Sequence, residues 1–161
     1  MVVEDRVFAN IISSYLSWDH PPLGLFDENL FLDDLISGRQ DFCSKLLVNA
    51  ILAFGSHNYA AIEPRMETLG SFFFVEAKQL WELDVGKDSL PSIAASGLLH
   101  SLHACRGKDK VGFQYLLQGV RMAKDLGLFR RRSAHQVYDI RQPRLRRGRA
   151  VVAWGLYGNL V

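Results

Sequence analysis

Two histidines and a cysteine in the middle of the chain have the residue types of a metal site. His100 and His103 are three residues apart, a spacing at which two imidazoles can share one face of a helix, as zinc ligands do. Cys105 falls on a different face, and the sequence offers no fourth ligand nearby. We therefore predict no metal site, and we interpret the histidines as polar rim residues or as buried, hydrogen-bonded side chains.

A carboxylate pair and a cysteine are the other candidates for chemistry. Asp33 and Asp34 are adjacent, and adjacent helix positions point about 100° apart, so we interpret both as solvated charges beside the core. Cys43 lacks an orienting third group and an oxyanion hole, and the glycines occur singly instead of forming a phosphate-binding loop. These patterns predict no catalytic residue and no enzyme activity.

One segment is strongly basic. Residues 130–149 contain eight arginines and a single acid, Asp139, which gives this segment a charge of +7 and the rest of the chain −5. Three interpretations remain open: a solvated, flexible loop between helices, a nuclear import signal, or a phosphate-binding surface. Seven of the eight are the candidate residues for a basic contact or an import signal: Arg130, Arg131, Arg132, Arg144, Arg146, Arg147 and Arg149.

The composition is that of a single globular domain. The chain has 161 residues, of which 48% are hydrophobic, and its net charge is only +2. We find neither the basic start of a signal peptide nor an apolar run of about 20 residues, so we predict an intracellular protein without membrane association. The two cysteines, Cys43 and Cys105, are expected to be small buried side chains in a reducing compartment.

Apolar residues recur at spacings of three and four along nearly the whole chain, which predicts an all-α fold. We expect about seven helices, arranged as antiparallel hairpins in a multi-helix array, with no sheet. Asp27 and Ser89 are predicted N-caps, and residues 41–59 are predicted to form the most buried helix. The expected helices cover residues 4–18, 27–35, 41–59, 65–83, 89–105 and 112–126, followed by an aromatic helix around Trp154.

Several sequence segments, which occur in the same order as in a known family, resemble that family. Residues 112–129 read GFQYLLQGVRMAKDLGLF, residues 74–82 read FVEAKQLWE, and residues 149–157 read RAVVAWGLY. Together with the pattern of residues 8–35, these resemble the middle regulatory region of fungal-specific transcription factors, which carry a zinc binuclear cluster for DNA binding. The resemblance covers most of the chain, and it implies that residues 1–161 form one partial regulatory domain.

The resemblance also limits what this chain can do. A zinc binuclear cluster needs six cysteines, whereas this chain has two, so we expect a fragment in which zinc and DNA binding belong to a missing N-terminal cluster. The family implies a nuclear role in regulating RNA polymerase II transcription, through contacts with other domains of the regulator, with the transcription machinery or with a small-molecule effector. It implies no cofactor in this chain. The alternative is a stand-alone helical scaffold without DNA binding.

Trp154 and Tyr157 stand out within the last phrase. Three residues apart, they lie on one side of the predicted helix. Two interpretations are open: the aromatics pack in the core against earlier helices, or they line a pocket where an effector or a partner helix docks.

Overall fold

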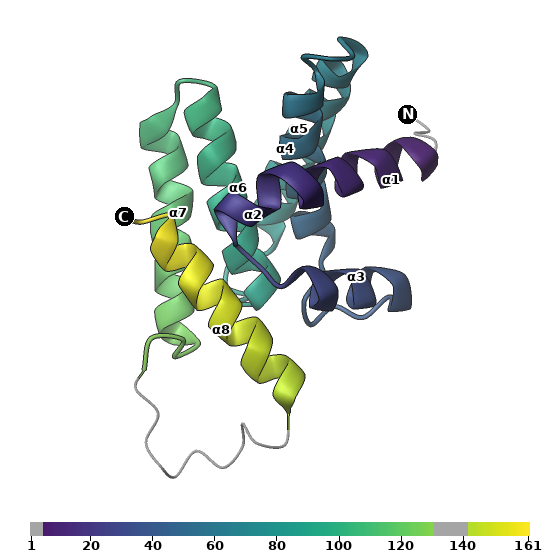
Figure 1. The fold of residues 1–161 in the computed structure, drawn as a ribbon. Coiled ribbons are helices and arrows are strands. Elements are labelled where there is room, and N and C mark those ends of the chain that lie inside the picture. Colours follow the sequence, from purple (N-terminus) through teal and green to yellow (C-terminus); the bar gives the residue numbers. More distant parts are fainter. Residues whose placement is uncertain (1–4, 131–141) are drawn as a thin grey trace.

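The computed structural model describes residues 5–130 and 142–161, and these residues form helices and connecting turns, with no strand among them (Figure 1). The all-α fold class is confirmed. The helices are α1 (Asp5–Ser14), α2 (His20–Leu23), α3 (Glu28–Ser37), α4 (Lys45–Tyr59), α5 (Arg65–Leu83), α6 (Leu90–Cys105), α7 (Asp109–Asp125) and α8 (Pro143–Gly158), with a π-helical turn, η1 (Tyr15–Asp19), between α1 and α2. No helix in the described part of the chain has the length and apolar character needed to cross a membrane.

Two helical hairpins form the body of the molecule. The helices α4 and α5 pack along each other, as do α6 and α7, and α4 joins the two pairs by packing on α6 (Figure 1). The turn between α6 and α7 is only three residues long, so the two helices must run antiparallel. This confirms the hairpin predicted for this part of the sequence.

The most buried helix is α6, and the prediction that residues 41–59 would hold this position is wrong. Every residue from Leu90 to Leu99 is buried. The reason is that α6 has neighbours on three sides, since it contacts α4, α7 and α8. Its small residues allow this close packing: a Cβ added at Gly97 would lie 2.5 Å from Leu25 Cδ2.

Helix starts follow the predicted capping chemistry. Asp27 accepts a hydrogen bond from Leu30 N at 3.0 Å, and Ser89 accepts one from Ser92 N at 3.2 Å. Both caps satisfy an amide that has no partner inside its helix. Pro91 lies in the first turn of α6, where the missing amide costs nothing.

The first helix does not end at the Pro21-Pro22 pair. Instead, the chain widens into the π-turn η1, in which His20 N donates to Tyr15 O, and then continues through the prolines as α2. Proline cannot donate a backbone hydrogen bond, so a local change of helix type beside it is the expected response. Gly24 ends α2 with a φ of 56°, a left-handed conformation that suits glycine.

A loop along the whole of residues 130–149 was one of the three interpretations of the basic segment, and it is wrong for residues 143–149. Residues 143–149 form the first two turns of α8, which begins with Pro143 and runs to Gly158. Arginine favours helices, and proline in the first turn sacrifices no hydrogen bond, so local preference permits this start. The part of the prediction that concerns residues 131–141 lies outside the described residues.

Candidate functional site

Asp34, on α3, is a fully buried carboxylate. Phe42 N donates to it at 2.8 Å, Arg144 on α8 lies 2.9 Å from it, and Arg39 lies 3.3 Å from it. Two guanidinium groups and an amide thus compensate a charge that would otherwise be very costly to bury. The expectation that both carboxylates of the pair are solvated holds for Asp33, which is exposed, and is wrong for Asp34.

Asp27 is a second buried acid that faces α8. One of its oxygens caps α3, and the other accepts a hydrogen bond from Arg147 Nε at 2.5 Å. Arg144 and Arg147 are three residues apart, so they project from the same side of α8, Arg147 toward the N-terminal end of α3 and Arg144 toward its C-terminal end. We call the pairs Arg144–Asp34 and Arg147–Asp27 the α3–α8 clamp.

Two glycines let α8 sit closely on the chain beneath it. A Cβ at Gly148 would lie 2.2 Å from the ring of Phe42, and a Cβ at Gly155 would lie 2.0 Å from Gly24 O. These distances are far below van der Waals contact, so neither position has room for a larger residue. Val152, between them on the same face, is buried. We call this buried face of α8, formed by Gly148, Val152 and Gly155, the seat of α8.

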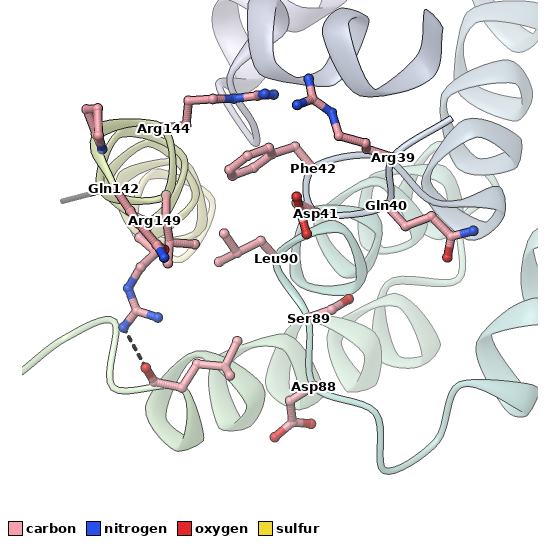
Figure 2. A pocket seen from close by; sticks show the side chains of 13 residues that line it. Arg39, Gln40, Asp41, Phe42, Asp88, Ser89, Leu90, Gln142, Arg144 and Arg149 are labelled. Carbon is pink, nitrogen blue, oxygen red and sulfur yellow. Dashed lines mark hydrogen bonds between the residues drawn. The ribbon is translucent and has the colours of Figure 1, made fainter. Parts of the chain in front are cut away.

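A groove of about 800 Å³ with a mixed polar and apolar lining opens beside the clamp (Figure 2). It is bordered by the α3–α4 loop, the start of α6 and the start of α8, and Arg149 closes one end by donating to Leu126 O at 2.6 Å. Charged and amide side chains share its wall with apolar residues such as Phe42 and Leu90, and no acid, base and nucleophile converge there. The lining residues are Arg39, Gln40, Asp41, Phe42, Asp88, Ser89, Leu90, Leu126, Gln142, Pro143, Arg144, Leu145 and Arg149.

The structure separates the predicted basic residues into two groups. Arg144, Arg147 and Arg149 bind acids or a carbonyl of the same chain, so the interpretation of these three as solvated loop charges is wrong. Arg130 and Arg146 are exposed and form no ion pair within the described residues. Arg131 and Arg132, which complete the predicted phosphate-binding or import segment, lie outside the described residues.

Trp154 and Tyr157 are on the surface, so their interpretation as core aromatics is wrong. Trp154 is 74% exposed and Tyr157 is 55% exposed, because the seat occupies the opposite face of α8. Their rings meet edge to face with centroids 6.2 Å apart. They line an open depression of about 390 Å³ together with Leu128, Phe129 and Ala153. The interpretation as pocket-lining residues stays a prediction.

His103 is buried and hydrogen-bonded, as one of the two sequence interpretations expected. Its Nδ1 lies 2.7 Å from Leu99 O, and its ring stacks on Tyr115 with centroids 5.0 Å apart. Burial lowers the pKa of His103, and nearby lysine and arginine charges lower it further. No group of potential metal ligands gathers in the described parts of the chain.

The two cysteines differ in their burial. Cys43 is buried as predicted, and burial together with the nearby Asp34 charge raises the pKa of its thiol to about 11. A thiol with this pKa stays protonated at neutral pH and makes a poor nucleophile. Cys105 is exposed, contrary to the prediction, because it is the last residue of α6.

The fold and the clamp define an all-α domain in which α8 is bound to α3 by ion pairs to two buried acids. This chain belongs to the family described as the fungal specific transcription factor domain, whose model matches residues 12–157. The two aromatics, the clamp and the seat all lie within the matched range.

Relatives with curated descriptions agree with this assignment. The nitrogen assimilation transcription factor nit-4 of Neurospora crassa is 31% identical over 137 residues, and nirA of Emericella nidulans, with the same description, is 31% identical over 133 residues. The notoamide biosynthesis transcriptional activator notL' of Aspergillus versicolor is 27% identical over 128 residues. The matches cover 76%, 78% and 78% of this chain but only 13%, 15% and 20% of nit-4, nirA and notL', respectively. No solved structure matches the chain significantly.

Proposed function

We propose that this chain is the regulatory, non-DNA-contacting part of a fungal transcription factor that acts in the nucleus on RNA polymerase II transcription. The family assignment supports this role, because the matched relatives are transcription factors. The domain would act through contacts with other domains of the regulator, with the transcription machinery or with a small-molecule effector, and it would perform no catalysis of its own.

In this proposal, DNA contact belongs to other parts of the regulator. A zinc cluster of six cysteines cannot be built from Cys43 and Cys105, of which Cys43 is buried. Arg144 and Arg147 of α8 are not free to bind phosphate either, because they pair with Asp34 and Asp27.

The observation that carries the proposal is the α3–α8 clamp. A helix held by two ion pairs and a narrow glycine seat has a docked state that a partner or effector can favour or oppose. An effector can shift such an equilibrium only if it binds the docked and undocked states with different affinity. The groove lies against the clamp and offers one place for this difference to arise.

A reporter assay tests the proposal. The 161-residue chain is placed between an unrelated DNA-binding domain and an unrelated activation domain, and activation is compared with that of a flexible Gly-Ser linker of equal length. We expect the folded chain to change activation at least twofold at equal protein abundance. Activation equal to that of the linker would contradict a regulatory role.

A further inference from the structure

The C-terminal end of α8 holds the end of α2. Asn159 Nδ2 donates to Leu23 O at 3.2 Å, although 136 positions separate the two residues in the chain. Leu23 is the last residue of α2, and the carbonyls at the end of a helix lack partners inside it. Beside this bond, a Cβ added at Gly155 would lie 2.0 Å from Gly24 O. The end of α8 therefore sits directly on the end of α2.

The same helix also covers the chain that follows α2. Residues 24–27, which we call the α2–α3 connection, have no regular secondary structure, and residues 25–27 are buried. Phe26 lines a small void with Gly148 and Val152 of α8. The α3–α8 clamp binds the next residue, Asp27. The connection thus lies under α8 from one end to the other.

Few other contacts fix this part of the described chain. No backbone–backbone hydrogen bond joins Leu25 or Phe26 to another described residue. Among the described helices, α2 packs extensively only on η1, which directly precedes it. Leu25 packs on α6, where Gly97 leaves room for its side chain. The α2–α3 connection therefore lies between α6 and α8, and the contacts with α8 hold it along its length.

Two buried polar atoms make the closed arrangement costly. The ring of His20, the first residue of α2, stacks on Phe26 with centroids 4.3 Å apart, and the ring of Tyr15 lies 5.9 Å from that of His20. Tyr15 Oη and His20 Nδ1 are buried and have no hydrogen-bond partner among the described residues. Unsatisfied buried polar groups favour states in which they meet water again. The contacts with α8 oppose such an opening.

From these contacts we propose that α8 is a latch for residues 20–27, so that undocking of α8 releases α2 and the α2–α3 connection together. The helix α1 and the turn η1 stay in place, because α4 holds them. A Cβ added at Gly55 of α4 would lie 2.8 Å from the side chain of Ile11, and Asn58 Nδ2 donates to Asp19 at 2.7 Å. The hairpin of α4 and α5 keeps its structure as well.

The latch deepens the regulatory role proposed above and depends on that role only for its effect on transcription. Coupling between two elements is reciprocal, so whatever loosens residues 20–27 also loosens α8. An effector that binds the released form of either element shifts both. The docked state of α8 can therefore be controlled from α2, away from the clamp and from the groove beside it.

Hydrogen–deuterium exchange of the purified full chain tests the latch. Asn159→Ala removes the bond to Leu23 O, and Gly155→Ala forces α8 away from Gly24 O. We expect the amides of residues 20–27 to exchange about tenfold faster in Gly155→Ala and about threefold faster in Asn159→Ala, with those of α5 within about twofold of the wild type. Circular dichroism establishes that each variant is folded.

Two controls separate this coupling from a general loss of stability. Gly158→Ala changes the same helix at a position where a Cβ meets nothing, and it should leave the exchange unchanged. Gly70→Ala inserts a methyl group between α5 and α4, 2.9 Å from Ser56 Cβ. It should speed the exchange of that hairpin without a selective effect on residues 20–27.

The reverse direction uses two glycines in turns. Gly24 and Gly86 have φ values of 56° and 84°, and a Cβ meets nothing at either, so alanine strains both backbones in the same way. Gly24→Ala should speed the exchange of α8 about threefold, whereas Gly86→Ala, in the turn between α5 and α6, should not change it. Because Gly24→Ala adds no clash with α8, it tests the latch should Gly155→Ala fail to fold.

Three results would overturn the inference: unchanged exchange of residues 20–27 in the α8 variants, an equal rise in every helix, or an α8 that does not respond to Gly24→Ala. Coupled exchange without any effect in the reporter assay would refute the regulatory role alone. A reporter effect of Arg144→Ala with unchanged exchange of residues 20–27 would refute only the latch.

Discussion

The guanidinium of Arg144 lies 2.9 Å from the carboxylate of Asp34, although 110 residues separate them in the chain. Asp34 is fully buried and Arg144 is partly exposed, so the pair joins the interior of α3 to the rim of α8. Breaking such a pair leaves a buried charge with less compensation, which costs more than the pair contributes when intact.

Arg144→Ala should therefore lower the free energy of unfolding by about 2 kcal/mol, because the hydrogen bond it removes involves a buried carboxylate. Urea denaturation of the purified chain measures the change. The matched control is Arg146→Ala on the same helix, where an exposed side chain is lost and a change within about 0.5 kcal/mol is expected. Equal losses in the two variants would contradict the clamp.

The seat of α8 predicts a contrast between two glycines of one helix. Gly155→Ala should destabilise the chain by about 2–3 kcal/mol, since its Cβ would lie 2.0 Å from a backbone oxygen that cannot move aside cheaply. Gly158→Ala has open space around the new methyl group and should be neutral or slightly stabilising. Thermal unfolding of both variants measures the change in stability. An unchanged stability of Gly155→Ala would contradict the close packing of α8 on Gly24.

The double role of Asp27 can be separated by two substitutions. Asp27→Asn keeps an oxygen that can cap α3 but removes the charge facing Arg147, and it should cost about 1 kcal/mol. Asp27→Ala removes both contacts and should cost about 2–3 kcal/mol. Denaturation midpoints compare the two, and indistinguishable losses would mean that the cap contributes nothing.

Two buried histidines predict a loss of stability in acid. Burial lowers the pKa of His20 and of His103 below the ordinary value of 6.5. Their neutral forms are favoured by folding, so this stability is complete above about pH 6.5 and is lost as the pH falls below it toward the folded-state pKa values. The unfolded chain takes up the protons first.

The measurement is the free energy of unfolding between pH 7.5 and 5. His103→Gln should make the pH dependence shallower below pH 6.5, whereas His57→Gln, which changes an exposed side chain, serves as the control. A curve that keeps its slope in His103→Gln would exclude His103 as a source of acid sensitivity.

Local patterns in the sequence predicted the features that depend on near neighbours. The Asp27 cap and the α6–α7 hairpin follow from residues a few positions apart, and both are confirmed. The burial of Asp34 could not be predicted in this way, because its partner Arg144 lies in a segment whose charge density indicated a solvated loop. A charge block of one sign contains no information on which distant acids will neutralise it.

The orientation of α8 was unpredictable for a similar reason. The helix was expected, but its buried face depends on Gly148 and Gly155, which pack against Phe42 and Gly24. Hydrophobic side chains alone suggest that Trp154 should face the core, whereas the seat needs the smallest residues there. The spacing of the two glycines, seven residues apart, is the signal that would have indicated the correct face.

In the regulatory role that we propose, the docked state of α8 determines what this domain does to transcription. The most direct measurement is reporter activation by the three-part fusion carrying the wild-type chain, Arg144→Ala or Arg146→Ala, with protein abundance measured in the same cells. We expect Arg144→Ala to move activation toward the Gly-Ser linker value and Arg146→Ala to resemble the wild type. Identical activation with all three chains would contradict the claim.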